Sequence, residues 1–145
     1  MTPSDEIRNL LGTYCECMDS GDFEGIGALF ARGALADEHG HPLAVGAEAV
    51  AAFYASGTML YDGSPRTKHL VSNSVFDLNE AAGTAVVRSS YVVLQQLPEA
   101  PLQPIIAGRY RDSFSHQDSA WHFVERRFLV DLLGDLSHHL NYVVG

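Results

Sequence analysis

The sequence has little cysteine, a shortage of positive charge and no long hydrophobic run. Its two cysteines, Cys15 and Cys17, lie on a predicted helix, where their side chains diverge by about 200°, so we expect no disulfide between them. Nine Lys and Arg residues stand against eighteen Asp and Glu, a formal net charge of -9. Such a field repels phosphate backbones and anionic lipids, so we expect neither nucleic acid nor a membrane as partner.

No apolar run approaches the ~20 residues that cross a bilayer, and the N-terminus lacks the basic start and apolar middle of a signal peptide. We therefore expect cytoplasmic localisation. The composition, 46% hydrophobic and 19% charged, is typical of a globular protein. A chain of 145 residues has the length of one domain, and we expect residues 1–145 to form one.

Hydrophobic periodicity predicts helices in the first part of the chain and strands in the rest. Apolar residues recur at helical spacing from Ser4, the expected cap, to Met18, and shorter helices are predicted over 23–30 and 48–55, with an extended piece over 35–38 between them. Four strands joined by hairpin-length connections are predicted at 66–78, 84–97, 104–116 and 121–133. The pattern predicts an α+β fold in which a strongly curved antiparallel sheet wraps around the helices.

Polar residues within otherwise apolar faces indicate a cluster inside this fold. Alternation along the first long strand places His69, Val71 and Asn73 on one face. On the first helix, Tyr14 lies in the apolar stripe and Asp19 at its end. Each of these residues also has a structural reading, as a core group with a satisfied hydrogen bond or as a helix cap.

The last strand carries two adjacent arginines, Arg126 and Arg127, in a run that otherwise looks buried. A buried arginine needs a carboxylate or a bound anion as partner. Alternation puts the two side chains on opposite faces and does not decide which faces the interior.

Taken together, the short motifs resemble the SnoaL-like family of the nuclear-transport-factor-2-like (NTF2-like) superfamily. The segments that carry the resemblance cover nearly the whole chain: Tyr14-x4-Asp19-x-Gly21-Asp22 with Leu29-Phe30, Arg66-Thr67-Lys68-His69 with Asn73, Gly108-Arg109-Tyr110-x-Asp112-x-Phe114, and Trp121-His122-Phe123-x-Glu125-Arg126. The resemblance implies a cone-shaped fold with an interior pocket. Its dehydratase members, such as scytalone dehydratase, imply catalytic roles for Tyr14, Asp19, His69 and Arg126.

This resemblance implies a cofactor-independent acid–base enzyme, a dehydratase or isomerase, acting on a hydrophobic polyketide-, steroid- or aromatic-like molecule. Asp19 would orient His69 as general base, and Tyr14, with Asn73 or the inward arginine, would stabilise an enolate oxygen. The substrate-binding residues that we expect to line the pocket are largely aromatic: Phe30, Phe53, Tyr54, Val71, Asn73, Tyr91, Tyr110, Phe114 and Trp121.

The sequence also permits other functions. The same acid and base could drive a polyketide or epoxide-opening cyclase, and the fold also serves as a non-catalytic binding or assembly module such as a dioxygenase β subunit. Segments 37–41 and 131–139 contain weak metal-ligand patterns, and we expect no metal. We expect a homo-oligomer, a dimer or a trimer, formed through apolar residues of the outer sheet face: Leu70, Phe76, Val92 and Leu94.

Overall fold

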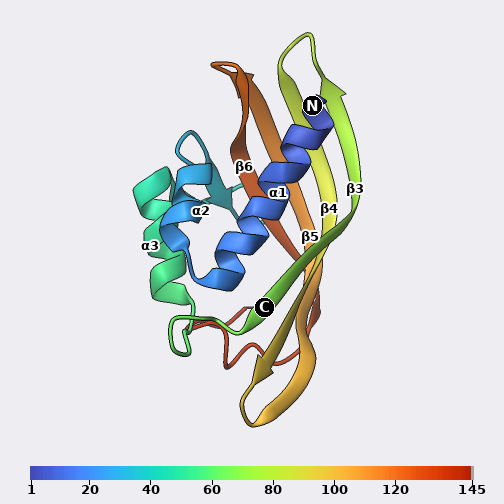
Figure 1. Ribbon diagram of the computed structural model, residues 1–145. Coiled ribbons are helices and arrows are strands. Elements are labelled where there is room, and N and C mark those ends of the chain that lie inside the picture. The colour runs from blue at the N-terminus through green and yellow to red at the C-terminus, as the bar shows by residue number, and fades with distance from the viewer. Residues whose placement is uncertain (145) are drawn as a thin grey trace.

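The computed structural model describes residues 1–144 and places three helices against one side of a single sheet (Figure 1). In chain order the elements are α1 (Pro3–Ser20), α2 (Phe23–Leu29), β1 (Ala34–Ala36), β2 (Pro42–Val45), α3 (Ala47–Gly57), β3 (Thr67–Asn79), β4 (Thr84–Leu97), β5 (Ala100–Gln117) and β6 (Ala120–Leu133). The strand order is β2-β1-β6-β5-β4-β3. The predicted α+β architecture is confirmed, with the addition that β1 runs parallel to β6 and makes the sheet mixed.

Helix α1 lies across the concave face of the sheet and carries the first part of the site (Figure 1). It begins with a capping box between Thr2 and Asp5, before the predicted cap at Ser4. It ends at Gly21, whose φ of +74° permits the left-handed turn and whose N–H bonds the carbonyls of the last turn. This end brings Asp19 against the start of β3, where its carboxylate accepts a hydrogen bond from the Thr67 hydroxyl.

A bulge in β3 changes which side chains face the interior. The pairing with β4 shifts between Ser72 and Val75, and Asn73 adopts a φ of +55° there. Because a bulge adds one residue, the alternation reverses beyond it. Asn73 is therefore exposed, and its predicted place beside His69 is wrong. Phe76, predicted on the outer face, packs against the core with Arg8 over its ring at 4.5 Å.

A second bulge, in β6, decides between the two arginines. Ser113 pairs with Glu125 but Phe114 pairs with Phe123, so Val124 is the extra residue. Beyond this bulge Arg126 shares the inner face with Phe123 and is 0% exposed. Arg127 is half-buried and pairs with Glu125.

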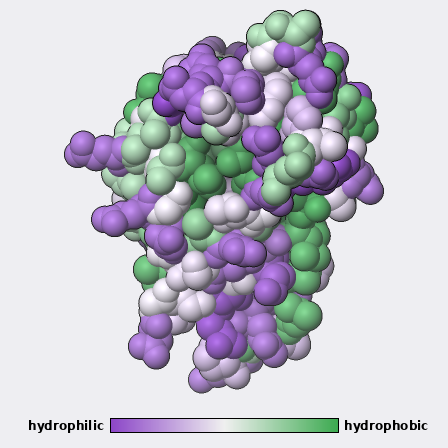
Figure 2. All heavy atoms as spheres, turned by 45° about the horizontal axis from the view of Figure 1, so that its top comes forward, coloured by the Kyte–Doolittle hydropathy of each residue, from purple (hydrophilic) through white to green (hydrophobic). Residues whose placement is uncertain are grey.

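The hydrophobic core consists of two clusters, and side chains from both line a cavity. The larger cluster joins the buried faces of α1, α2 and α3 to β4, β5 and β6, and the smaller one contains Tyr91, Val93, Ile105 and Tyr110. Both cysteines are free, as expected. No helix among residues 1–144 is long and apolar enough to cross a membrane. The face in Figure 2 is mostly hydrophilic, with hydrophobic residues gathered in a hollow near its centre.

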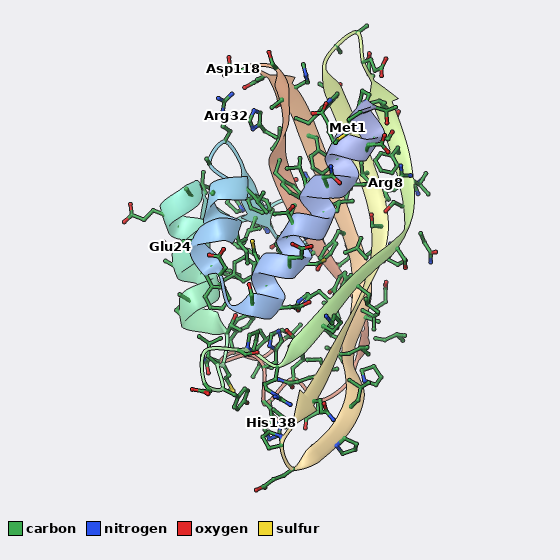
Figure 3. The ribbon with its side chains drawn as sticks, viewed as in Figure 1. Met1, Arg8, Glu24, Arg32, Asp118 and His138 are labelled. Atoms are coloured by element: carbon green, nitrogen blue, oxygen red, sulfur yellow. The ribbon has the colours of Figure 1, made fainter. Side chains whose placement is uncertain are left out.

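Different parts of the chain close the two ends of the molecule. At one end an ion pair of 2.8 Å joins Arg32 to Asp118 in the β5–β6 hairpin (Figure 3). At the opposite end the C-terminal segment, residues 134–144, returns to the chain between α3 and β3. The carbonyl of His139 accepts a hydrogen bond from the Met59 N–H at 2.8 Å, and the Asn141 N–H donates to the Gly57 carbonyl at 2.8 Å.

Candidate functional site

Asp19 and His69 are in direct contact. The Nδ1 atom of His69 lies 2.6 Å from Oδ1 of Asp19, and the carboxylate also accepts the His69 backbone N–H at 2.9 Å and the Thr67 hydroxyl at 3.0 Å. The two side chains are only 6% and 15% exposed. Because an ionised carboxylate only accepts hydrogen bonds, Nδ1 carries the proton and Nε2 keeps its lone pair. The arrangement therefore holds one tautomer of the imidazole.

His69 lines a cavity of about 500 Å³ between α1, α3, the sheet and the C-terminal segment. Its volume is that of a pocket for a small organic molecule. Four of the predicted lining residues are on its wall: Phe53, Tyr54, Tyr91 and Tyr110. The rings of Tyr91 and Tyr110 stack at 4.3 Å and give the wall a flat aromatic section.

The other predicted lining residues lie elsewhere. Phe30, Phe114 and Trp121 belong to the large core cluster and do not line the cavity. Val71 packs between the two clusters. Periodicity assigns a residue to the interior, and it does not separate a core wall from a cavity wall.

Two tyrosine hydroxyls form a hydrogen-bonded pair on the cavity wall. The hydroxyl of Tyr14 on α1 bonds that of Tyr54 on α3. Burial raises the pKa of Tyr14 to about 12, and it holds the pKa of Tyr54 well above 10. Both hydroxyls are therefore protonated at neutral pH. One of their two hydrogens is used within the pair, so the pair can donate one hydrogen bond to a ligand oxygen.

Arg126 lies beneath this tyrosine layer rather than on the cavity wall. Its guanidinium makes two hydrogen bonds with Asp112, of 2.8 and 3.0 Å, and neither side chain is exposed. The guanidinium carbon is 4.2 Å from the ring centre of Tyr14 and 3.6 Å from that of Tyr110. The predicted contact of Arg126 with substrate is thus replaced by a supporting position, from which its charge opposes the rise in the pKa of Tyr14.

The C-terminal segment supplies a second histidine that is absent from the predicted site. His139 is only 4% exposed, lines the cavity, and has its ring centre 6.1 Å from that of His69. Burial, and then the neighbouring His69, lowers the pKa of His139 to about 4. The spacing of Leu136, His139 and Leu140, which is that of one helical turn, is the sequence signal that indicates an inward-facing segment here.

The segments with weak metal-ligand patterns form local pairs. His41 Nδ1 lies 3.0 Å from an Asp37 oxygen, and His138 lies 3.8 Å from Asp135. Among residues 1–144 there is no group of three or more His, Cys, Asp or Glu side chains that could hold a metal ion.

Comparison with known proteins gives a family and a fold. The sequence model of the SnoaL-like domain matches residues 2–127. No curated protein matches the chain. Among solved structures, an NTF2-like protein with a cystatin-like fold from Novosphingobium aromaticivorans has a TM-score of 0.71 and 25% identity, over 88% of this chain and 80% of that one.

Two further structures from the same organism have the same fold. A candidate scytalone dehydratase has a TM-score of 0.71 and 22% identity, over 98% of this chain and 89% of that one. The β subunit of a candidate aromatic-ring-hydroxylating dioxygenase has a TM-score of 0.68 and 19% identity, over 89% of each chain. The predicted NTF2-like fold is therefore confirmed.

Proposed function

The chain belongs to the SnoaL-like domain family, and within it we propose a cofactor-independent acid–base enzyme that dehydrates or isomerises a hydrophobic small molecule. The observation that carries the proposal is the 2.6 Å contact between Asp19 and His69 on the wall of an aromatic cavity. A carboxylate that fixes one imidazole tautomer is the arrangement a general base needs.

The first step is proton removal by His69. The Asp19 carboxylate holds the proton on Nδ1, so the lone pair of Nε2 is free to accept a proton from carbon. The carbon must be acidic, which requires a neighbouring carbonyl or conjugated ring. The imidazolium that forms stays paired with Asp19, and its charge is balanced at the place where it develops.

The second step concerns the oxygen and the fate of the proton. The enolate oxygen accepts a hydrogen bond from the Tyr14 and Tyr54 hydroxyl pair, which burial keeps protonated. If the imidazolium returns the proton to a leaving hydroxyl, the C–O bond breaks and water departs. If it returns the proton to another carbon, the double bond shifts and the product is an isomer.

The shape and lining of the cavity favour a flat conjugated substrate of polyketide, steroid or aromatic type. The stacked Tyr91 and Tyr110 rings present an aromatic wall, and Phe53 adds a further ring. The likeness to a candidate scytalone dehydratase is consistent with this class, although at 22% identity it carries the fold alone.

The test is deuterium exchange into β-tetralone, an aromatic ketone whose acidic carbon lies next to the carbonyl. We expect the protein to accelerate exchange in deuterium oxide above the buffer rate, and His69→Ala to lose ~10²- to 10⁴-fold of that acceleration. The matched control is His39→Ala, which removes an exposed histidine and should exchange like the parent. Exchange by His69→Ala at the parent rate would exclude His69 as the base.

Two rival functions predict different outcomes, one in the mass of the product and the other in the exchange experiment. A cyclase uses the same base, but its product by epoxide opening keeps the mass of the substrate, whereas dehydration loses the mass of water. A non-catalytic assembly module, to which the likeness to a dioxygenase β subunit points, predicts no exchange above buffer and binding to a partner α subunit.

A further inference from the structure

The second histidine of the cavity lies opposite the proposed base. His139 and His69 both line the cavity, with ring centres 6.1 Å apart and ring planes at 63°. A hydrogen-bonded atom lies about 3 Å from a ring nitrogen. One ligand can therefore present a carbon to His69 and the adjacent carbonyl oxygen to His139 at the same time.

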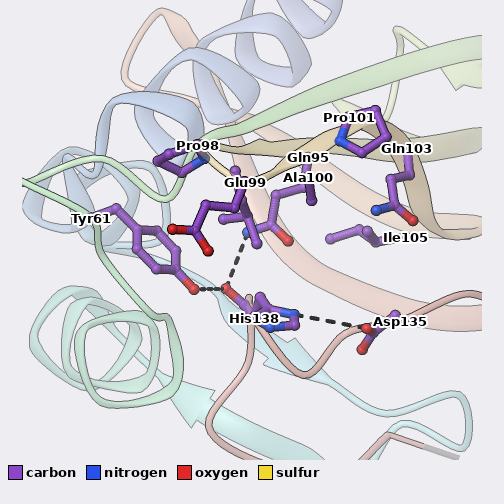
Figure 4. A pocket seen from close by; sticks show the side chains of 11 residues that line it. Tyr61, Gln95, Pro98, Glu99, Ala100, Pro101, Gln103, Ile105, Asp135 and His138 are labelled. Carbon is purple, nitrogen blue, oxygen red and sulfur yellow. Dashed lines mark hydrogen bonds and ion pairs between the residues drawn. The ribbon is translucent and has the colours of Figure 1, made fainter.

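Hydrogen bonds to the backbone carbonyls of His138 and His139 fix the position of His139. On the side away from the cavity, the His138 carbonyl accepts hydrogen bonds from the Tyr61 hydroxyl and from Gln95 Nε2, the latter at 3.1 Å (Figure 4). Gln95 also bonds the Pro65 carbonyl at 3.1 Å, and the His139 carbonyl accepts the Met59 N–H at 2.8 Å. The segment thus presents His139 to the cavity through hydrogen bonds of its backbone.

The imidazole of His139 has unused hydrogen-bonding capacity. Its Nδ1 is buried and has no hydrogen-bond partner among residues 1–144. Buried polar atoms in proteins are rarely left unpaired, and each exception calls for an explanation. Nε2, the other ring nitrogen, makes no hydrogen bond among residues 1–144 either and is not fully covered, so it is the atom of this ring that a ligand in the cavity can reach.

The protonation state of His139 separates its role from that of His69. Burial and the nearby His69 lower the pKa of His139 to about 4, while the Asp19 carboxylate opposes this shift. The ring is therefore neutral near pH 7 and carries one N–H, which it can donate. A proton taken up by His69 disfavours a second positive charge beside it, so His139 does not compete for that proton.

From this geometry we infer that His139 is a second catalytic histidine, which donates a hydrogen bond to the carbonyl oxygen of the substrate while His69 removes the proton from the adjacent carbon. The inference deepens the proposed function and rests on it. It also narrows the substrate to compounds with a carbonyl next to the acidic carbon. His139 lies in the C-terminal segment, beyond residues 2–127, which match the family model.

The experiment uses β-tetralone labelled with a carbon isotope at its carbonyl and measures two quantities, the NMR shift of that carbonyl when bound and the rate of deuterium exchange. Hydrogen bonding moves the carbonyl resonance downfield. We expect this displacement in the parent. In His139→Phe, where only the tyrosine pair still donates to the oxygen, we expect a smaller displacement and exchange slowed by ~10²-fold, and we expect partial recovery of both in His139→Gln, which keeps an N–H donor.

Two control variants separate the failure of this inference from the failure of the proposed function. His69→Ala should lose exchange but keep the carbonyl displacement, because the oxygen contact remains. His138→Gln alters the exposed neighbour on the other face of the segment and should match the parent in both measurements. If the parent shows the displacement without exchange, the hydrogen bond to His139 stands and the acid–base function fails.

Three results would overturn the inference. One is a folded His139→Phe variant that keeps the parent's carbonyl displacement and exchange rate. Another is a parent protein that does not bind β-tetralone. The third applies if the His139→Phe variant does not fold. In that case the ring-nitrogen NMR signal of His139 is measured in the parent, and a signal that stays unchanged on adding β-tetralone would overturn the inference.

Discussion

Replacing Asp19 with asparagine should switch the tautomer of His69 and remove its function as a base. The carboxylate accepts three donors, the Thr67 hydroxyl, the His69 backbone N–H and His69 Nδ1, at 3.0, 2.9 and 2.6 Å. An asparagine has only one acceptor oxygen, and its NH₂ group must face at least one of these donors. The outcome depends on which donors can adapt.

The backbone N–H of His69 cannot change, whereas the Thr67 hydroxyl can rotate and the imidazole can move its proton. The orientation of lowest cost therefore points the asparagine oxygen at the backbone N–H and its NH₂ at Nδ1. Nδ1 then accepts, and the proton resides on Nε2, the atom that should act as the base. We expect exchange to fall ~10²- to 10⁴-fold, as for the loss of a positioned base, and stability to fall by about 1–3 kcal/mol.

Ring-nitrogen NMR of His69 reports the tautomer, and β-tetralone exchange reports the rate. The matched control is Thr67→Val, which removes one donor but leaves the bond between Asp19 and Nδ1. It should keep the parent tautomer and most of the rate. An Asp19→Asn protein with the parent tautomer and the parent exchange rate would refute the reasoning.

Three further predictions follow from the buried groups. Arg126→Met should destabilise the protein by about 3–5 kcal/mol in chemical denaturation, because Asp112 remains buried and unpaired. Adding Asp112→Leu should restore much of the loss, and equal stability of the single and double variants would contradict this. Tyr54→Phe should lower exchange, because Tyr14 loses the hydroxyl to which it bonds, without changing the His69 tautomer; an unchanged rate would exclude the tyrosine pair. The pKa of His139 is lowered in the folded state to about 4, so the unfolded state binds more protons between pH 6.5 and 4. The free energy of unfolding should therefore fall by about 3 kcal/mol from pH 8 to pH 4. His139→Gln should reduce this decline.

The sequence predicts the elements well and the faces of the strands only up to each bulge. Apolar spacing locates α1, and alternation places His69 inward, because both periods hold without interruption there. It fails at Asn73 and leaves Arg126 undecided, because one extra residue in a strand reverses the pattern. Asn73 is itself a faint signal, since asparagine tolerates the positive φ that it adopts.

Hydrophobic periodicity predicts no helix or strand in the C-terminal segment. The segment forms no regular helix or strand after β6, and its position depends on pairing with the backbone of Gly57 and Met59, far away in the sequence. Such contacts leave no sequence pattern beyond the single-turn spacing of Leu136, His139 and Leu140. His139 therefore looks like a solvated terminal residue in the sequence and is buried in the structure.

Two parts of the chain line the cavity, and they contribute different groups. One carries the acid–base pair, and the other forms the opposite wall. Residues 2–127, which match the family model, contain Asp19, His69 and both tyrosines of the hydroxyl pair, so the groups of the proposed proton transfer lie within this range. Residues beyond that range, among them Leu136, His139 and Leu140, close the opposite wall. Because this wall is held by backbone hydrogen bonds and a few anchoring side chains, its lining can change without disturbing the acid–base pair. The substrate of this chain should therefore be sought by varying the oxygen function that faces His139, with the acidic carbon facing His69 kept constant.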